Sequence, residues 1–149
     1  FFNHNEMPLE TVNDQDDGYQ FIGFHGKGGC FHNVSWQLRK AYILEARPLD
    51  PNHPLSKRVF YLDAQTMMPA YGNIFDRAGN LWKIAIAGYS HPDAHHPDNK
   101  DSGTPIIDVV SMIDVQAMHC TTLQFKATIS REPFSVLDFT PQALRIKGK

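Results

Sequence analysis

The sequence has few of the features that mark several common classes of protein. It contains only two cysteines, Cys30 and Cys120, and no CxxC pair, which disfavours a zinc knuckle or a thioredoxin-type redox site. Its 14 Lys and Arg and 16 Asp and Glu are scattered along the chain, so no nucleic-acid-binding stripe is expected. No apolar run approaches the roughly 18 residues of a transmembrane helix, and the opening FFNHNE is unlike a signal peptide. We therefore expect a soluble chain from which any targeting peptide is already gone.

Motifs of catalysis and of cofactor binding are also missing. There is no Gly-x-Ser-x-Gly, no phosphate loop and no dinucleotide fingerprint, and KGGC at 27–30 is too short to count as one. His119 stands next to Cys120, but consecutive side chains of a strand point to opposite faces, so a Cys–His dyad is not expected. We therefore expect neither an enzyme nor a bound cofactor.

What the sequence does contain is a series of strand patterns. Segments 57–63, 67–76 and 81–89 alternate apolar and polar residues, and Asp76 with Gly79 fits a type I hairpin turn between the last two. They predict a three-stranded antiparallel meander. Further strands are expected within 19–26, 35–49, 109–116 and 118–128, with a turn at 50–56 and a polar loop at 90–104.

Helix signals are confined to the C-terminus, where Thr140 suits an N-cap, Pro141 the first helical position and Gly148 the end of a short helix. The 149 residues fit one domain. We predict an N-terminal arm over 1–18 and, over 19–149, a single mainly β domain built on a curved antiparallel sheet that forms an incomplete barrel.

Both faces of the expected meander are rich in apolar residues, and the chain has little helix with which to cover them. If each strand keeps a period of two, one face gathers Phe60, Leu62, Met68, Ile74, Trp82, Ile84 and Ile86. Apolar surface without internal cover usually marks a binding surface. The cover is then an apolar ligand, a partner chain or an absent part of the same protein; the alternative is a second sheet that closes the core and leaves no cavity.

Polar candidates for a site are weaker. Arg39, Arg58 and Lys83 lie on or beside the strands and either rim a cavity for an anionic head group or are ordinary solvated charges that discourage edge pairing. His91, His95 and His96 share one loop and are weak metal candidates, because their spacing matches no established motif; a solvated polar loop is the favoured reading.

The two cysteines leave two alternatives open. They form either one disulfide that closes a long loop, which would stabilise the fold by ~3–4 kcal/mol, or two free thiols.

Four ordered pieces of the chain resemble a known family: HPLSKRVFYLD at 53–63, FDRAGNLWK at 75–83, MIDVQAMH at 112–119 and FTPQALR at 139–145. They are similar to the C-terminal part of the bacterial family catalogued as domain of unknown function 1329, although Phe75-Asp76 stands where the family usually has Tyr-Asp. Because members are considerably longer than 149 residues, the resemblance implies that this chain is the C-terminal portion of a longer protein.

The resemblance also implies a fold and a setting. Members look like periplasmic proteins with a fold similar to the lipoprotein-localisation carriers of the LolA/LolB type, in which an incomplete antiparallel barrel wraps over helices and accepts acyl chains on its concave side. Their genes commonly accompany resistance-nodulation-division exporters and an outer-membrane barrel protein.

Three functional hypotheses follow, in this order. The first is a periplasmic protein that binds or carries a lipid or another hydrophobic compound together with such an exporter and outer-membrane partner. The second is a structural or adaptor subunit that docks by its apolar sheet face onto a transporter or onto its own missing N-terminal part. The third, a metal-dependent hydrolase using the 91–101 loop, has the least support.

Overall fold

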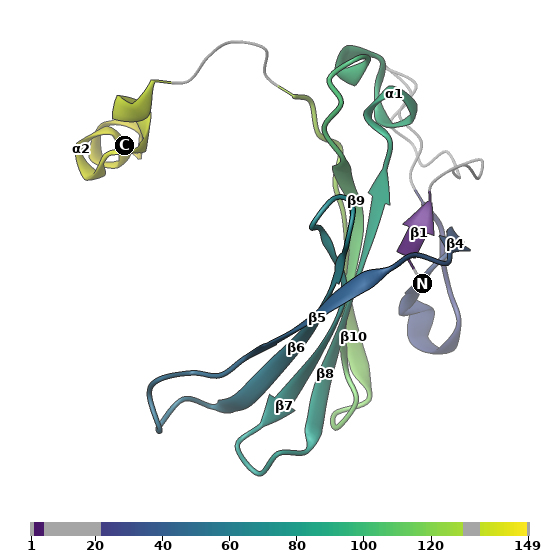
Figure 1. The fold of residues 1–149 in the computed structure, drawn as a ribbon, viewed down its shortest axis with the longest axis vertical. Helices are drawn as coiled ribbons and strands as arrows, with labels where there is room; N and C mark the ends of the chain where they lie inside the picture. The colour runs from purple at the N-terminus through teal and green to yellow at the C-terminus, as the bar shows by residue number, and fades with distance from the viewer. Residues whose placement is uncertain (1, 5–21, 130–134, 149) are drawn as a thin grey trace.

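The computed structural model describes residues 22–129 and 135–148, and the backbone alone of residues 2–4 (Figure 1). No helix within these ranges is both long enough and apolar enough to cross a membrane. The elements, in chain order, are β1 (Phe2–His4), β2 (Phe24–His25), η1 (Lys27–Gly29), β3 (Phe31–His32), β4 (Ser35–Gln37), β5 (Ala41–Ala46), β6 (Leu55–Asp63), β7 (Pro69–Asp76), β8 (Leu81–Ser90), α1 (Pro92–His95), η2 (Pro97–Asn99), β9 (Ile106–Asp114), β10 (His119–Gln124), η3 (Val136–Phe139) and α2 (Pro141–Lys147).

The main sheet is an antiparallel meander of six strands in the order β10-β9-β8-β7-β6-β5. Each strand therefore pairs with its neighbours in the chain, and the sheet curves strongly along its length (Figure 1). Within the described residues its two edge strands, β5 and β10, do not pair with each other, so the sheet is not closed. The predicted mainly β fold with a curved, incomplete antiparallel sheet and a short C-terminal helix is confirmed.

The turn between β7 and β8 forms as its residues dictate. The backbone N–H of Gly79 donates to the Asp76 carbonyl at 3.0 Å, and the Asn80 N–H donates to the Asp76 carboxylate at 2.8 Å. Gly79 has a φ of +85°, a conformation that glycine adopts without the steric cost of a side chain. Directly after this turn, Ile74 pairs with Lys83 but Phe75 pairs with Leu81, which leaves Trp82 as an extra residue on β8. This β-bulge shifts the register of β8 by one residue.

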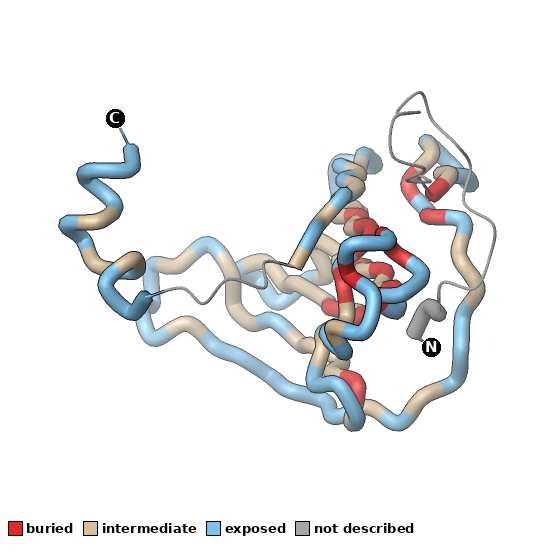
Figure 2. The backbone as a smooth tube through the Cα atoms, turned by 90° about the horizontal axis from the view of Figure 1, so that it is seen from above, coloured by how far each residue is buried: buried red, intermediate tan, exposed pale blue. Residues whose placement is uncertain are grey.

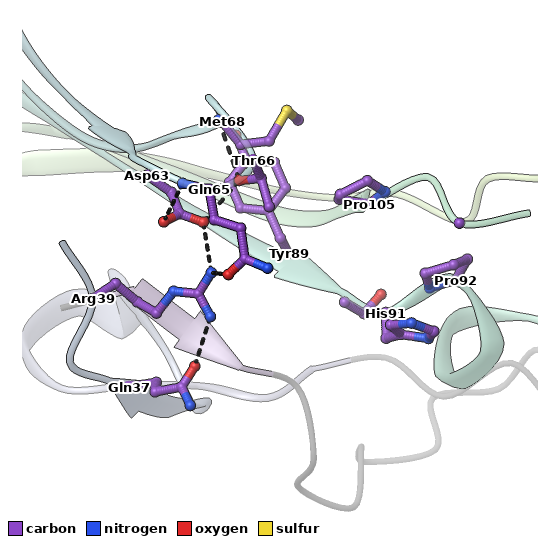
Figure 3. Close-up of a pocket in the computed structure, with 12 residues that line it drawn as sticks. Gln37, Arg39, Asp63, Gln65, Thr66, Met68, Tyr89, His91, Pro92 and Pro105 are labelled. Atoms are coloured by element: carbon purple, nitrogen blue, oxygen red, sulfur yellow. Dashed lines mark hydrogen bonds and ion pairs between the residues drawn. The ribbon is translucent and has the colours of Figure 1, made fainter. Parts of the chain in front are cut away.

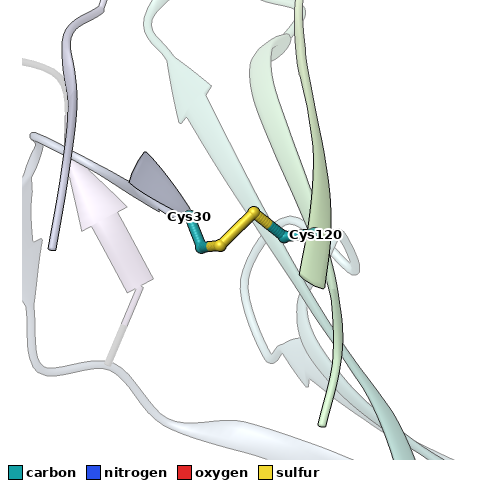
Figure 4. The surroundings of a disulfide bond; sticks show 2 residues. All are labelled: Cys30 and Cys120. Atoms are coloured by element: carbon teal, nitrogen blue, oxygen red, sulfur yellow. A yellow bond between two sulfur atoms is a disulfide. The ribbon is translucent and has the colours of Figure 1, made fainter. Parts of the chain in front are cut away.

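The N-terminal segments cover one side of the main sheet. The β2–β3 hairpin is tied to β10 by a disulfide between Cys30 and Cys120, which is the first of the two alternatives left open by the sequence (Figure 4). Gln124 on β10 also exchanges hydrogen bonds with the backbone N–H and carbonyl of Ile22. The buried apolar core lies at this junction and at the adjoining part of β8 and β9; it includes Ile22, Cys30, Ile86 and Val109 (Figure 2).

Several boundaries differ from the prediction. The single strand expected over 35–49 is two strands, because β4 pairs with β1 whereas β5 pairs with β6. The strand expected at 109–116 is β9, which starts at Ile106 and ends at Asp114, and the following strand, β10, ends at Gln124. The C-terminal helix is confirmed with its expected cap, since the Thr140 hydroxyl accepts a hydrogen bond from the Ala143 N–H at 3.2 Å. Residues 5–18 of the expected arm lie outside the described residues.

Candidate functional site

The register of the main sheet assigns its side chains to two faces, because directly paired residues of antiparallel strands share a face. One unbroken row crosses all six strands as Leu44, Phe60, Gly72, Ala85, Met112 and Thr121. The neighbouring row is Ala46, Arg58, Ile74, Lys83, Asp114 and His119. Every residue in these rows except Gly72 and Asp114 is at least partly exposed. We call this face the open face, and the side against which the Cys30–Cys120 disulfide packs the covered face.

The open face has an apolar floor whose central residues are small and whose flanking residues are larger. Gly72 and Ala85 stand at the centre of the first row between the larger Phe60 and Met112. The Phe60 ring lies against Gly72, where a Cβ atom would come within 3.3 Å of its Cδ1. Towards the two edge strands, Leu44 and Leu123 are each 50% exposed. Large apolar side chains that face water in this way form a surface suited to an apolar ligand.

A cavity of about 360 Å³ lies on the open face where β6 to β9 meet the loop before β6. Ile74, Trp82 and Met112 form its apolar wall, and His53, Pro54 and Leu55 bound it on the loop side. Trp82, the extra residue of the bulge, lines this cavity beside Lys83, and its indole Nε1 donates to the Asp114 carboxylate at 2.8 Å.

Two cations, Arg58 and Lys83, line the same cavity. The Lys83 ammonium lies 4.5 Å from the centroid of the Trp82 ring, a cation–π contact that holds it over the apolar wall. Within the described residues neither cation forms an ion pair. Both charges are therefore available to an anionic group placed over the cavity.

The carboxylate of Asp114, the cross-strand partner of Lys83, is engaged by N–H groups. It accepts hydrogen bonds from the backbone N–H groups of Ala117 at 2.8 Å and Gln116 at 3.1 Å as well as from Trp82. The Ala117 hydrogen bond is the main cause of a lowered pKa of Asp114, since together with the other donors it outweighs the effect of burial. Asp114 therefore stays ionised and fixes the Trp82 indole beside the cavity.

The structure brings together six of the residues predicted for the ligand site. Phe60, Leu62 and Ile74 share the open face, and Trp82, Arg58 and Lys83 join them at or beside the cavity. The prediction that Ile84 and Ile86 lie on the same face is wrong. Ile84 pairs with Asn73 and Ile86 with Tyr71 on the covered face, where Ile86 is only 8% exposed. The Trp82 bulge is the reason. Without the extra residue, Ile74 would pair with Trp82, and both Ile84 and Ile86 would then lie on the open face, as predicted. The bulge shifts the residues after Trp82 by one position, which moves both isoleucines to the covered face.

Met68 and Arg39 lie at the other end of the sheet, in a polar pocket of about 260 Å³ (Figure 3). Arg39 forms an ion pair with Asp63 at 3.0 Å and donates a second hydrogen bond to Gln65 at 2.7 Å. Burial raises the pKa of Asp63, but hydrogen bonds from Thr66 and Arg39 lower it further, so the net shift is downward. Arg39 is thus committed to bracing the β6–β7 turn, away from the two cations of the open face.

The loop that contains the predicted metal candidates is partly buried, so the prediction of a solvated polar loop is wrong. His95, His96 and Asn99 are buried, whereas His91 is exposed and caps α1. Asn99 donates to the Ala127 carbonyl and accepts from the Ile129 N–H, both at 2.7 Å. Its side-chain amide therefore pairs with two backbone groups of this segment, as a neighbouring strand would. No group of three His, Cys, Asp or Glu in the described part of the chain is arranged to hold a metal ion. Asn99 and His95, whose Nε2 accepts the Ala127 N–H, hold the loop against residues 127–129.

His95 lies beside Ser90 and Asp108, a set of residue types that invites comparison with a hydrolase triad. Both partners contact the same ring atom, Nδ1, which is 3.2 Å from the Ser90 hydroxyl and hydrogen-bonded to the Asp108 carboxylate. The other nitrogen, Nε2, accepts the Ala127 N–H at 3.0 Å. A triad requires the serine and the carboxylate on opposite nitrogens, so this buried cluster joins α1, β9 and the segment after β10 and has no relay geometry.

Several residues of the candidate site were missed by the sequence prediction, including His53, Pro54 and Leu55 before and at the start of β6 as well as Met112 and Leu44. Met112 lines the cavity, but its segment, IIDVVSMI, also fits a helical spacing and its face was not assigned. Leu44 belongs to the first row of the open face, but the register that places it opposite Phe60 is set by pairing, which a single strand pattern does not reveal. The sequence does contain a signal for Met112, because a strand period of two puts it on the same face as Val110 and Asp114.

Comparisons with known proteins agree with this architecture. A solved domain from Vibrio parahaemolyticus, described as a candidate outer membrane lipoprotein-sorting protein, matches with a TM-score of 0.54 and 21% sequence identity. The match covers 72% of this chain and 43% of that one, so the chain spans about two fifths of the solved protein. No curated protein matches the chain. The model of the family described as "Protein of unknown function (DUF1329)" matches residues 6–145, which confirms the resemblance seen in the sequence: the chain belongs to the DUF1329 family.

Proposed function

We propose that this protein binds and carries a lipid or another hydrophobic compound with an anionic group, and that it does so in the periplasm of the bacterial envelope. The observation that carries the proposal is the open face, whose apolar floor leads into a cavity flanked by Arg58 and Lys83 without ion-pair partners among the described residues. The apolar floor would take the hydrocarbon part and the two cations the head group.

The fold and the family support this proposal. The similarity to a candidate lipoprotein-sorting domain concerns the fold alone, but it is a fold whose curved sheet leaves a face available, as the open face is here. We further propose that the chain is the C-terminal portion of a longer carrier. In that setting a resistance-nodulation-division exporter and an outer-membrane barrel protein would be its partners, and its role is binding rather than catalysis.

The driving force for binding would be removal of apolar surface from water, at about 25 cal/mol per Å². Such a term depends little on the detailed shape of the ligand, so a range of chain lengths and branching patterns should bind. Selectivity would come from the head group, because Arg58 and Lys83 offer charge-assisted hydrogen bonds only to an anion.

Neighbouring residues of β5 offer a matched test. Leu44 lies on the open face and Ile43 on the other face, and they are 50% and 69% exposed. Each is replaced by glutamate, and binding is followed by displacement of a fluorescent fatty acid and by native mass spectrometry of co-purified lipid. We expect Leu44→Glu to weaken binding about tenfold or more and Ile43→Glu to leave it within about twofold. Equal effects of the two changes, or no lipid and no fatty-acid displacement in the unchanged protein, would refute the proposal.

A second candidate function is an adaptor that uses the same apolar face to dock onto a transporter or onto the rest of a longer chain. The observation in its favour is that the chain spans only about two fifths of the solved protein it resembles. Light scattering separates the two functions: a stable protein complex that contains no lipid and that Leu44→Glu disrupts supports docking over carrying.

A further inference from the structure

We propose that a second and separate ligand site lies beside the Cys30–Cys120 disulfide, and that it takes a small apolar molecule with one anionic group. The site is a cavity of about 540 Å³ between the N-terminal hairpin and the end of the main sheet where β9 turns into β10. Its volume lies within the range of roughly 300–1,000 Å³ that is typical of small-molecule sites. Of the residues that line it, Asp114 and His119 also belong to the second row of the open face, whereas the others belong to the hairpin, the covered face and the turn after β9. The site does not depend on the proposed function.

One wall of the cavity is built by the glycine-rich segment KGGC and the residue after it. Phe31 supplies the apolar surface, and its ring packs on Gly26, where a Cβ atom would lie 2.8 Å from the ring. Gly28 lies against the disulfide, since a Cβ there would come within 3.3 Å of the Cys30 sulfur. Gly26 and Gly28 have φ values of +75° and +69°. These glycines let the hairpin fold tightly around the disulfide and leave Phe31 facing the cavity.

The opposite wall comes from the sheet. Ile113 near the end of β9, and Val115 and Met118 in the turn that follows, are apolar. Cys120 pairs with Ile113 on the covered face. Both cysteines line the cavity, and the disulfide joins the hairpin to β10 (Figure 4). A cavity lined in this way by aromatic, aliphatic and sulfur-containing side chains would bury the apolar body of a ligand.

One cation that lines this cavity, Lys27, is placed to meet an anionic group. Lys27 lines it from η1, is exposed and has no ion pair among the described residues. The carboxylate that also lines it, Asp114, is already held by the three N–H donors described above. The proposal therefore predicts a preference for an anionic over a neutral ligand of the same shape.

A second turn with the same sequence pattern provides a matched control for the turn beside the cavity. The pattern Asp-x-Gln-x-Met occurs at 63–67 and again at 114–118, and in both turns the aspartate carboxylate accepts the glutamine N–H. Met67 and Met118 both have a positive φ, 59° and 55°, and are 58% and 66% exposed. Only Met118 lines the cavity. Aspartate tolerates this backbone conformation, so Met118→Asp and Met67→Asp are matched substitutions that preserve the turns.

The test uses protein labelled with ¹³C at the methionine methyl groups and two probes that differ only by a sulfonate: 1-anilinonaphthalene-8-sulfonate and its neutral parent N-phenyl-1-naphthylamine. Met118 reports on the disulfide cavity, Met112 on the open face and Met67 on neither. We expect the sulfonate to shift the Met118 signal in a saturable way. Because Met118→Asp removes the methionine reporter, both aspartate variants are compared by the fluorescence of the sulfonate probe in the Leu44→Glu background, in which binding at the open face is suppressed. Met118→Asp should weaken binding at the disulfide cavity about tenfold or more, and Met67→Asp should leave it unchanged. Lys27→Gln should weaken the sulfonate about two- to fivefold and leave the neutral probe unchanged.

The result also separates this site from the open face. Leu44→Glu should suppress the response of Met112 and leave the response of Met118 intact. The proposal is overturned by an unshifted Met118 signal at saturating probe, by equal affinities of the two aspartate variants, or by loss of the Met118 response in Leu44→Glu. An equal effect of Lys27→Gln on both probes would overturn the preference for an anion.

Discussion

Removal of the Cys30–Cys120 disulfide should loosen one end of this protein and spare the other. The two cysteines are 90 residues apart in the sequence, and closing a loop of that length in the unfolded chain corresponds on the chain-entropy model to a stabilisation of about 4–5 kcal/mol, which is above the ~3–4 kcal/mol expected from the sequence. A typical domain is stable by only about 5–15 kcal/mol, so this is a large share. The double substitution Cys30→Ala/Cys120→Ala is therefore expected to lower the free energy of unfolding by several kcal/mol.

The loss should be felt unevenly. Apart from the disulfide, the described ties between the hairpin and β10 include the hydrogen bonds of Gln124 to Ile22, whereas β5, β6 and β7 are held by their own ladders. Urea unfolding of the oxidised protein and of the double variant measures the magnitude, and amide hydrogen exchange locates it. Exchange should rise in residues 22–34 and change little in β6 and β7. A difference in unfolding free energy below about 1 kcal/mol, or a uniform rise in exchange across the sheet, would refute the reasoning; reductant should have no effect on the double variant, which is the control.

Three further predictions follow from single side chains. Arg58→Gln/Lys83→Gln should weaken binding of an anionic lipid about tenfold at low salt and that of a neutral lipid of equal chain length much less, measured by titration at two ionic strengths; equal losses would exclude the head-group role. Burial, assisted by the charge of His25, lowers the pKa of His32 to about 4, so the unfolded state binds the proton first and stability should fall by up to about 3 kcal/mol as the pH drops from 6.5 to 4. His32→Phe should flatten this fall in urea unfolding measured across that pH range, and an unchanged slope would contradict the assignment. Asn99→Ala should cost about 2–3 kcal/mol and speed exchange of the Ile129 amide, because it leaves buried backbone groups unpaired, while the exposed neighbour Asp98→Ala should cost less than about 0.5 kcal/mol; similar costs for the two would show that the Asn99 hydrogen bonds do not hold the loop.

The local part of this fold could be predicted from the sequence, and the turn after β7 shows why. Asp76 and Gly79 specify that turn through interactions within five residues, so the hairpin follows from composition alone. Thr140 and Pro141 specify the start of α2 in the same way. The curved antiparallel sheet then follows from a succession of such hairpins.

The candidate site was predicted only in part because its geometry depends on one non-local contact. Trp82 is bulged out of register, and its indole is bonded to Asp114, a residue 32 positions further along the chain. A prediction from a period of two along each strand cannot include that contact. It therefore placed Phe60 and Ile74 correctly but put Ile84 and Ile86 on the wrong face. The prediction of a solvated loop was wrong for a similar reason. His95 and Asn99 are buried against residues 127–129, and the loop sequence alone does not predict this contact.

The order of strands in the main sheet has a consequence for how the chain reaches its native state. Because every strand pairs only with its chain neighbours, the sheet can grow one hairpin at a time by closing short loops, a route that is fast for its size. The links that join distant parts, Cys30 to Cys120 and Ile22 to Gln124, span 90 and 102 residues and gain their partners only once β10 is in place. Oxidation of the cysteines is thus expected as a late event, one that locks an assembled sheet instead of guiding its assembly.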